Sequence, residues 1–282
     1  MKKIIILSAV LSLMIAAANA QTIAAATNTR KLPNVQEKSV RAPATIKIDG
    51  KRPEWDNQIQ AINKATSILY TISNDDDKLY LVVLAADLDI ATKIINAGLT
   101  FTIHGSAKAK DDNGIAITFP FLYYDDFDNK VNGAPAIDYR NDLTGRNQKL
   151  TSMAKDIRVE GIKGVKDTIS IYNPEGIKAA ILFDEQEVLT YELAIPLKYL
   201  ELSVKEPKPF AYTIRLNGAP NYPDKGLEFN LITAFRRTRY GGKGIRGFNI
   251  RGDTMSMYGE NADIIKSLIS PTDFSGEYTL AK

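Results

Sequence analysis

The residues best suited to bind a ligand lie in FPFLYYDDFDNKVNGAP, residues 119–135, where aromatic and acidic side chains alternate. The segment lacks the clean periodicity of a strand. An aromatic ring can stack on the apolar face of a pyranose, and adjacent carboxylates accept hydrogen bonds from its hydroxyl groups. We therefore expect a glycan site formed by Tyr123, Tyr124, Asp125, Asp126 and Phe127. In the alternative interpretation, the rings point inward from a strand and the aspartates form a solvated turn.

The same acidic residues offer oxygen ligands at a spacing that suits calcium. A structural calcium site would be formed by Asp125, Asp126, Asp128 and Asn132. The segment does not match an EF-hand loop, because Lys130 stands where a ligand belongs and the downstream glutamate is missing. Apart from this calcium, the sequence predicts no cofactor. A second acidic run, NDDD at 74–77, is interpreted as a hairpin connection.

An arginine-rich segment, residues 236–253, is the one strong charge asymmetry of the chain. Arginine forks pair bidentately with carboxylate, sulfate or phosphate, and the glycines of this segment allow close approach of the backbone. It could contact an acidic polysaccharide or an acidic envelope partner. The alternative is a solvated loop that balances acids elsewhere. The residues expected to bind are Arg236, Arg237, Arg239, Tyr240 and Arg246.

The sequence does not support catalysis. His104 is the sole histidine, no G-x-S-x-G motif accompanies it, and we expect it at the rim of a strand with a satisfied hydrogen bond. A less favoured interpretation makes it an axial haem ligand opposite Met153, Met255 or Met257. The acid pair Asp184 and Glu185 does not indicate a glycosidase, since neighbours on a strand point to opposite faces. We expect a protein that is not an enzyme.

The N-terminus predicts export. Residues 1–20 contain two lysines, an apolar run and an Ala-x-Ala site, which is the pattern of a cleaved signal peptide. The remainder has 34 basic and 33 acidic residues, so charge gives no argument for a nucleic-acid partner. No later segment is apolar for long enough to span a membrane. Without cysteine, the fold must be held by its core alone. We expect a periplasmic or extracellular protein.

Short segments rich in Ile, Val, Thr, Tyr and Phe, separated by turn residues, predict an antiparallel β-sandwich of jelly-roll or immunoglobulin-like type. Residues 21–44 are expected to form a flexible leader, and residues 45–282 a single domain. Two helices are expected, at 91–98 and 196–202. Strands are expected at 45–48, 66–72, 78–86, 99–103, 114–120, 156–162, 167–173, 178–183, 187–195, 210–218 and 227–235.

Three motifs occur in order along the chain: IKIDGKRPEW at 46–55, DDKLYLVV at 76–83 and YELAIP at 191–196. Together they resemble family 9 carbohydrate-binding modules and the wider DOMON-like β-sandwich superfamily. The resemblance implies that Trp55 packs under the sheet and that Asp49 and Glu54 bond to nearby backbone, with Gly50 in the turn between them. A lone tryptophan beside a strand end also favours burial.

The resemblance and the aromatic–acidic segment together predict a non-catalytic module that binds carbohydrate. An envelope protein that uses the arginine-rich segment on an anionic glycan or protein partner is the alternative from another class. A haem-binding domain is the third.

Overall fold

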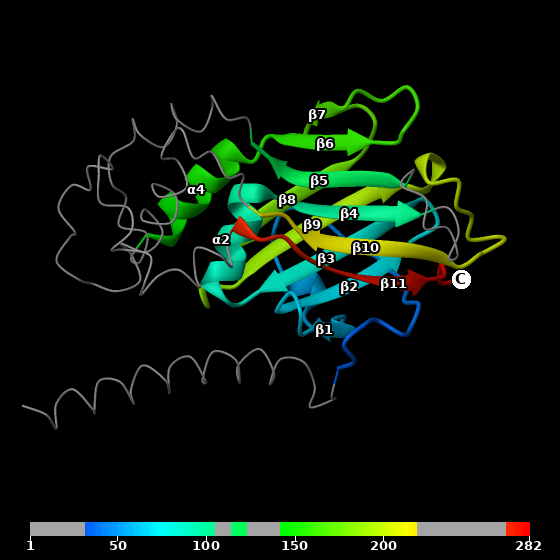
Figure 1. Ribbon diagram of the computed structural model, residues 1–282, viewed down its shortest axis with the longest axis horizontal. Coiled ribbons are helices and arrows are strands. Elements are labelled where there is room, and N and C mark those ends of the chain that lie inside the picture. Colours follow the sequence, from blue (N-terminus) through cyan, green and yellow to red (C-terminus); the bar gives the residue numbers. More distant parts are fainter. Residues whose placement is uncertain (1–31, 105–113, 123–141, 219–268) are drawn as a thin grey trace, which may run out of the picture.

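The structure, a computed structural model, describes residues 32–104, 114–122, 142–218 and 269–282. These residues form two antiparallel sheets packed face to face, with short helices at the edges (Figure 1). The all-β sandwich that the sequence predicts is therefore confirmed. Within the described ranges, no helix has the length and hydropathy needed to cross a membrane.

The first sheet has five strands in the order β1-β2-β3-β9-β8. Their bounds are β1 Ala61–Asn63, β2 Ile68–Asn74, β3 Lys78–Ala85, β8 Lys178–Phe183 and β9 Leu189–Pro196. The second has six strands in the order β11-β10-β4-β5-β6-β7. Their bounds are β4 Leu99–His104, β5 Ile115–Phe121, β6 Asp156–Glu160, β7 Thr168–Ser170, β10 Phe210–Leu216 and β11 Thr272–Tyr278.

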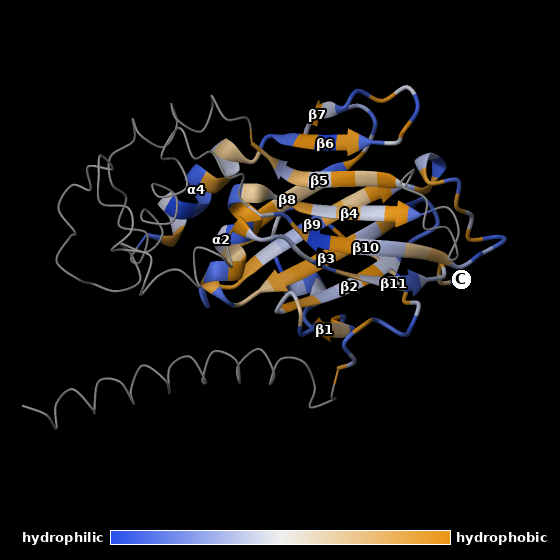
Figure 2. Cartoon of the chain, viewed as in Figure 1, coloured by the Kyte–Doolittle hydropathy of each residue, from blue (hydrophilic) through white to orange (hydrophobic). Residues whose placement is uncertain are grey.

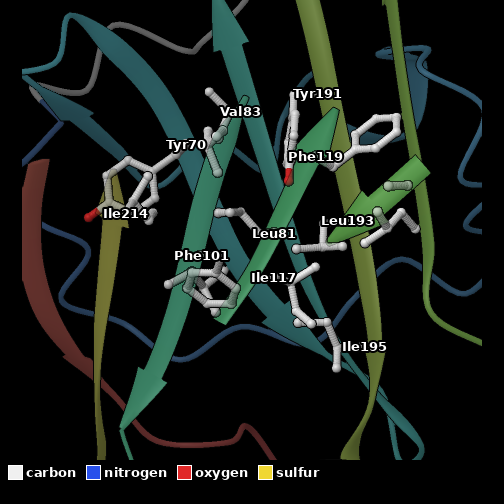
Figure 3. Packing of buried hydrophobic residues seen from close by; sticks show 14 of the residues in the cluster. Tyr70, Leu81, Val83, Phe101, Ile117, Phe119, Tyr191, Leu193, Ile195 and Ile214 are labelled. Atoms are coloured by element: carbon white, nitrogen blue, oxygen red, sulfur yellow. The ribbon is translucent and has the colours of Figure 1, made fainter. Parts of the chain in front are cut away.

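The core lies between the sheets. In β4 every second residue is buried, because successive side chains of a strand point to opposite faces. Figure 3 shows Phe101 and Ile117 of the six-stranded sheet packing near Leu81 and Leu193 of the five-stranded sheet. The hydropathy colouring of Figure 2 follows this alternation along the strands.

The five-stranded sheet is buried on both faces. Every residue of β2 and β9 is buried, so something must cover the outer face. Two small apolar clusters, built around Ile59 and around Trp55, pack there against outward-facing side chains such as Leu84 and Val82. Residues 32–60 therefore add a partial third layer to the sandwich.

The predicted flexible leader, 21–44, is wrong in its second part. The side chain of Gln36 pairs with both backbone groups of Ile72, accepting from its N–H at 2.7 Å and donating to its carbonyl at 2.8 Å. The N–H of Ala42 donates to the carbonyl of Asn74 at 2.9 Å. The reason is that β1 pairs with only the first three residues of β2, so the remaining edge needs other partners.

Helix α2, Leu88–Ala97, corresponds to the first expected helix. Its C-terminus is closed by Gly98, whose φ of 79° suits glycine and whose N–H donates to Ile94. The second expected helix is a single 3-10 turn, η2 (Leu197–Tyr199). Pro196 is its N-cap residue and not, as predicted, its first helical residue. Helix α4, Leu143–Met153, was not expected.

Most expected strands are present within one to three residues of their predicted bounds. Residues 45–48 form no strand, although Ile46 and Ile48 pack beside Trp55. Strands β1 and β11 were not predicted, because β1 is three residues long and β11 is polar on one face. Residues 227–235 lie outside the described residues.

Candidate functional site

All the ligand-binding residues expected from the sequence lie outside the described residues; of the segment 119–135, the structure describes residues 119–122 alone. The structure therefore does not place the aromatic–acidic site, the calcium ligands or the arginine-rich segment. Among the residues that are described, no group of three or more His, Asp or Glu could hold a metal ion. The residues left unplaced are Tyr123, Tyr124, Asp125, Asp126, Phe127, Asp128, Asn132, Arg236, Arg237, Arg239, Tyr240 and Arg246.

Trp55 is fully buried, as expected, and it anchors the outer layer. It ends a 3-10 turn, η1 (Pro53–Trp55), and its indole N–H donates to Glu192 Oε1 at 2.7 Å. The other carboxylate oxygen of Glu192 accepts from the backbone N–H groups of Asp49 at 2.8 Å and Gly50 at 2.6 Å. One carboxylate on β9 thus fastens the whole 49–55 segment to the sheet.

Glu192 has no exposed surface, and burial raises the pKa of its carboxyl to about 7. The hydrogen bonds from Trp55, Gly50 and Asp49 act in the opposite direction. Because the group is enclosed by the segment that it holds, it cannot reach a ligand in this arrangement. We interpret it as a structural group.

Three other residues of the motif at 46–55 have different roles. Asp49 accepts a hydrogen bond from the N–H of Lys51 at 3.0 Å, in agreement with the backbone bond implied by the resemblance. Gly50 has φ of 80°, and a Cβ there would lie 2.9 Å from backbone atoms of β8. Glu54 is half-buried and forms no hydrogen bond with any described residue, so the bond expected for it is not found in that part of the chain.

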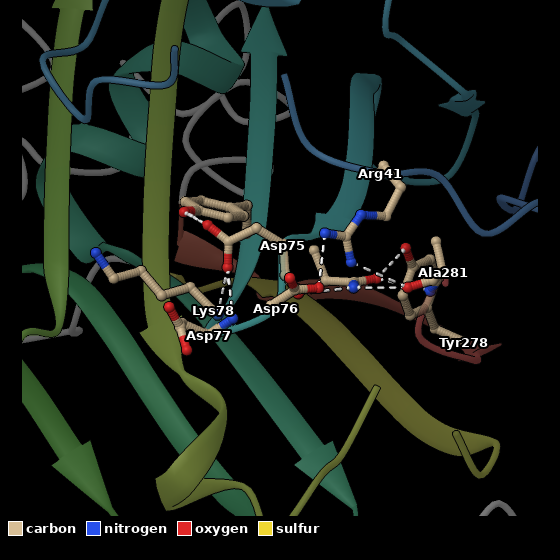
Figure 4. Close-up of polar contacts among 9 residues, drawn as sticks. Arg41, Asp75, Asp76, Asp77, Lys78, Tyr278 and Ala281 are labelled. Carbon is tan, nitrogen blue, oxygen red and sulfur yellow. Dashed lines mark hydrogen bonds and ion pairs between the residues drawn. The ribbon is translucent and has the colours of Figure 1, made fainter. Parts of the chain in front are cut away.

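The acidic run at 74–77 is the β2–β3 hairpin connection, as expected (Figure 4). Asp75 accepts hydrogen bonds from the N–H groups of Asp77 and Lys78, and from the Tyr80 hydroxyl at 2.5 Å. Burial would raise the pKa of Asp75, but these bonds outweigh it and lower the pKa. Asp76 pairs with Arg41 at 2.8 Å. Asp75 and Asp76 therefore stabilise the hairpin and its contact with Arg41.

His104 ends β4 at the end of the sandwich away from α4, whose last residue is Met153 (Figure 1). This arrangement does not suit a haem held between those two residues. Met255 and Met257 lie outside the described residues. One ring nitrogen of His104 lies 3.4 Å from the Thr213 hydroxyl, and the other is buried without a partner among the described residues. His104 therefore has one hydrogen bond within the described residues, to Thr213, and it is long.

Asp184 belongs to the β8–β9 turn and is also a structural group. Its carboxylate accepts from the N–H groups of Gln186 and Val188, each at 2.9 Å, and pairs with Arg52 at 3.3 Å. Its neighbour Glu185 is exposed.

An exposed aromatic residue lies elsewhere, in the turn after β7. Tyr172 is 74% exposed, far more than any other large hydrophobic residue in the described ranges. The turn is fixed by buried Asn173, whose amide donates to the carbonyls of Ser170 at 2.7 Å and Ile177 at 2.6 Å. Its side-chain oxygen accepts from the N–H of Gly176 at 2.9 Å. The ring is therefore presented to solvent by a rigid turn.

Beside this turn, α4 presents a polar face. The helix is held on β8 by Asn147, which pairs with both backbone groups of Phe183 at 2.8 and 2.9 Å. Arg146 lies over the Phe183 ring at 4.3 Å, and Leu150 is buried. An adjoining side of α4 lines an open groove of about 540 Å³, within the size range of small-ligand sites. Its lining residues are Leu143, Thr144, Asn147, Gln148, Thr151, Ser152 and Lys155.

Lys155 joins the turn to the groove. It is one of the lining residues, and its amine lies 5.4 Å from the centre of the Tyr172 ring and 3.5 Å from the Tyr172 hydroxyl. The backbone connects the same two segments, since the N–H of Ile171 donates to the carbonyl of Lys155 at 2.8 Å. We call Tyr172 together with the groove-lining residues the Tyr172 surface.

The Tyr172 surface combines an accessible ring with hydroxyl and amide groups. A ring can contact an apolar ligand face, and the side chains of Gln148, Thr151 and Ser152 can exchange hydrogen bonds with a polyhydroxylated ligand. Among the described residues that line the groove, none carries a carboxylate. Sequence reasoning missed this surface. The signal that could have indicated it is Tyr-Asn-Pro-x-Gly at 172–176, a turn sequence that follows an aromatic residue.

A scan against protein-family models finds no match to the chain, and a search of curated proteins finds none either. The chemistry of the described surface is therefore the basis on which function is proposed.

Proposed function

We propose that the protein is an exported, non-catalytic module that binds a glycan at the Tyr172 surface. Export is inferred from the signal-peptide pattern of residues 1–20. The resemblance to family 9 carbohydrate-binding modules supports the same class of function, and the sandwich architecture is compatible with it.

The observation that carries the proposal is the exposure of Tyr172 beside a groove lined by amide and hydroxyl side chains and by Lys155. A large ring that is 74% exposed on a rigid turn loses little conformational entropy when a ligand stacks on it. Pyranose rings have an apolar face and a polar rim, which matches a ring beside amide and hydroxyl side chains. The groove lining offers hydrogen-bonding groups without the carboxylate pair that glycoside hydrolysis uses.

The test is a glycan-array screen of the mature protein and of Tyr172→Ala. The matched control is Ile62→Ala, which truncates the other exposed large hydrophobic residue, on β1 of the five-stranded sheet and 39% exposed. We expect glycan signals that Tyr172→Ala loses and Ile62→Ala keeps.

Glycan binding that survives Tyr172→Ala would move the site away from this surface. Binding to no glycan would contradict the proposed function itself.

A further inference from the structure

We propose that the glycan bound at the Tyr172 surface carries an anionic substituent, a carboxylate or a sulfate ester, that pairs with the amine of Lys155. This inference rests on the proposed function and names the class of its ligand.

The charge of the lining is the first argument. Lys155 is the one charged residue that lines the groove, and no acid accompanies it there. Its amine forms no ion pair with any described residue; its recorded side-chain contacts are with the Tyr172 ring and hydroxyl. An ammonium group without an ion-pair partner, beside a stacking platform, is placed to meet an anionic group on the ligand.

The turn that carries the ring has a second lysine and a glutamate nearby. The amine of Lys178 reaches the carbonyls on either side of Tyr172, Ile171 O at 3.3 Å and Asn173 O at 3.4 Å. Glu175 lies in the same turn but forms no ion pair within the described ranges. Lys178 is thus a second cation near the ring, and the carboxylate of Glu175 in the same turn offsets part of its charge, so Lys155 is the cation that a ligand seated on the ring and in the groove would meet.

The geometry also sets the position of the anionic group. The Lys155 amine approaches the ring at 5.4 Å, while 74% of Tyr172 remains exposed. A pyranose stacked on the exposed part of the ring would direct a substituent from its rim toward the groove, where Lys155 lies. An anionic group at that position replaces the weak contact between the amine and the hydroxyl with a charge-assisted hydrogen bond.

The experiment compares probes that differ only in charge. Oligogalacturonate is titrated against its methyl ester, and sulfated galactan oligosaccharide against its desulfated form, by calorimetry at low salt. The two pairs distinguish a carboxylate from a sulfate ester. Lys155→Met removes the charge but keeps an apolar stem. Lys198→Met is the matched control, because the Lys198 amine lies 4.8 Å from the centre of the Tyr199 ring but lines no part of the groove.

We expect the charged member of one pair to bind about two- to fivefold more tightly than its neutral counterpart, the effect of one partly exposed ionic contact. Lys155→Met should abolish that preference, and Lys198→Met should keep it. Equal binding of charged and neutral probes, both weakened by Tyr172→Ala, would overturn the anionic inference and leave the proposed function standing. If no glycan binding depended on Tyr172, both the anionic inference and the proposed function would be contradicted.

Discussion

Glu192 should make the stability of the sandwich fall as the pH rises from 5 to 7. Its carboxyl is buried under the 49–55 segment, and its pKa is raised from 4.5 to about 7. An acid whose pKa is raised by folding holds its proton more tightly in the folded state. Its contribution to stability is therefore complete below the ordinary pKa and is lost as the pH rises through the folded pKa.

The size of this effect follows from the shift. Each pH unit between the two pKa values costs about 1.4 kcal/mol, so the interval from pH 5 to 7 should cost about 2–3 kcal/mol. Asp75, whose pKa is lowered, loses its contribution to stability at lower pH and so changes stability in the opposite direction. The comparison with Glu192→Gln, which cannot titrate, isolates the contribution of Glu192.

Urea unfolding measured at several pH values is the assay, with the fluorescence of the single, buried Trp55 as reporter. Glu192→Gln should be less stable at pH 5, because its amide places two N–H hydrogens among the three N–H groups that point at this side chain, whereas the protonated carboxyl places one O–H hydrogen there. The difference in unfolding free energy between wild type and variant should shrink as the pH rises. A difference that stays constant or grows would refute the reasoning, because it would mean that the three N–H donors stabilise the charged form more than burial destabilises it.

Three further substitutions test the fold and the site. Asn74→Ala removes the amide that pairs with both backbone groups of Ala281, at 2.8 and 3.0 Å, and should lower the unfolding free energy by about 2 kcal/mol in urea titrations. Gly50→Ala combines a φ of 80° with a 2.9 Å contact, so it should destabilise in thermal melts by about 1–3 kcal/mol more than Gly164→Ala, which has a similar φ and open space. Tyr172→Ala should change the unfolding free energy by less than about 0.5 kcal/mol, because the ring is exposed; a larger loss would assign it a structural role.

The fold could largely be predicted from the sequence because its strands are long and apolar. Segments such as 78–86 and 187–195 contain strand-forming residues in runs that no other element explains. The covering of the five-stranded sheet could not be predicted, since residues 32–44 are polar and bond through individual side chains such as Gln36. Helix α4 was missed because its apolar contacts to β8 involve few residues, chiefly Leu150.

The candidate site was less predictable than the fold. Buried Trp55 could be assigned from its neighbours, but its partner Glu192 lies 137 positions away and could be identified only in three dimensions. The exposure of Tyr172 was indicated by the turn sequence that follows it and not by the residue type, since tyrosine is intermediate between buried and exposed residues. Its importance follows from Asn173, which fixes the turn, and from Lys155, which the sheet pairing brings beside it.

The most direct test of the account is the affinity of one array-selected glycan for wild type, Tyr172→Phe and Tyr172→Ala, measured by calorimetry. The account predicts that Tyr172→Phe, which keeps the stacking ring, binds within about threefold of wild type, whereas Tyr172→Ala loses about tenfold or more. Equal affinity for all three proteins would contradict the claim that this exposed ring binds the glycan.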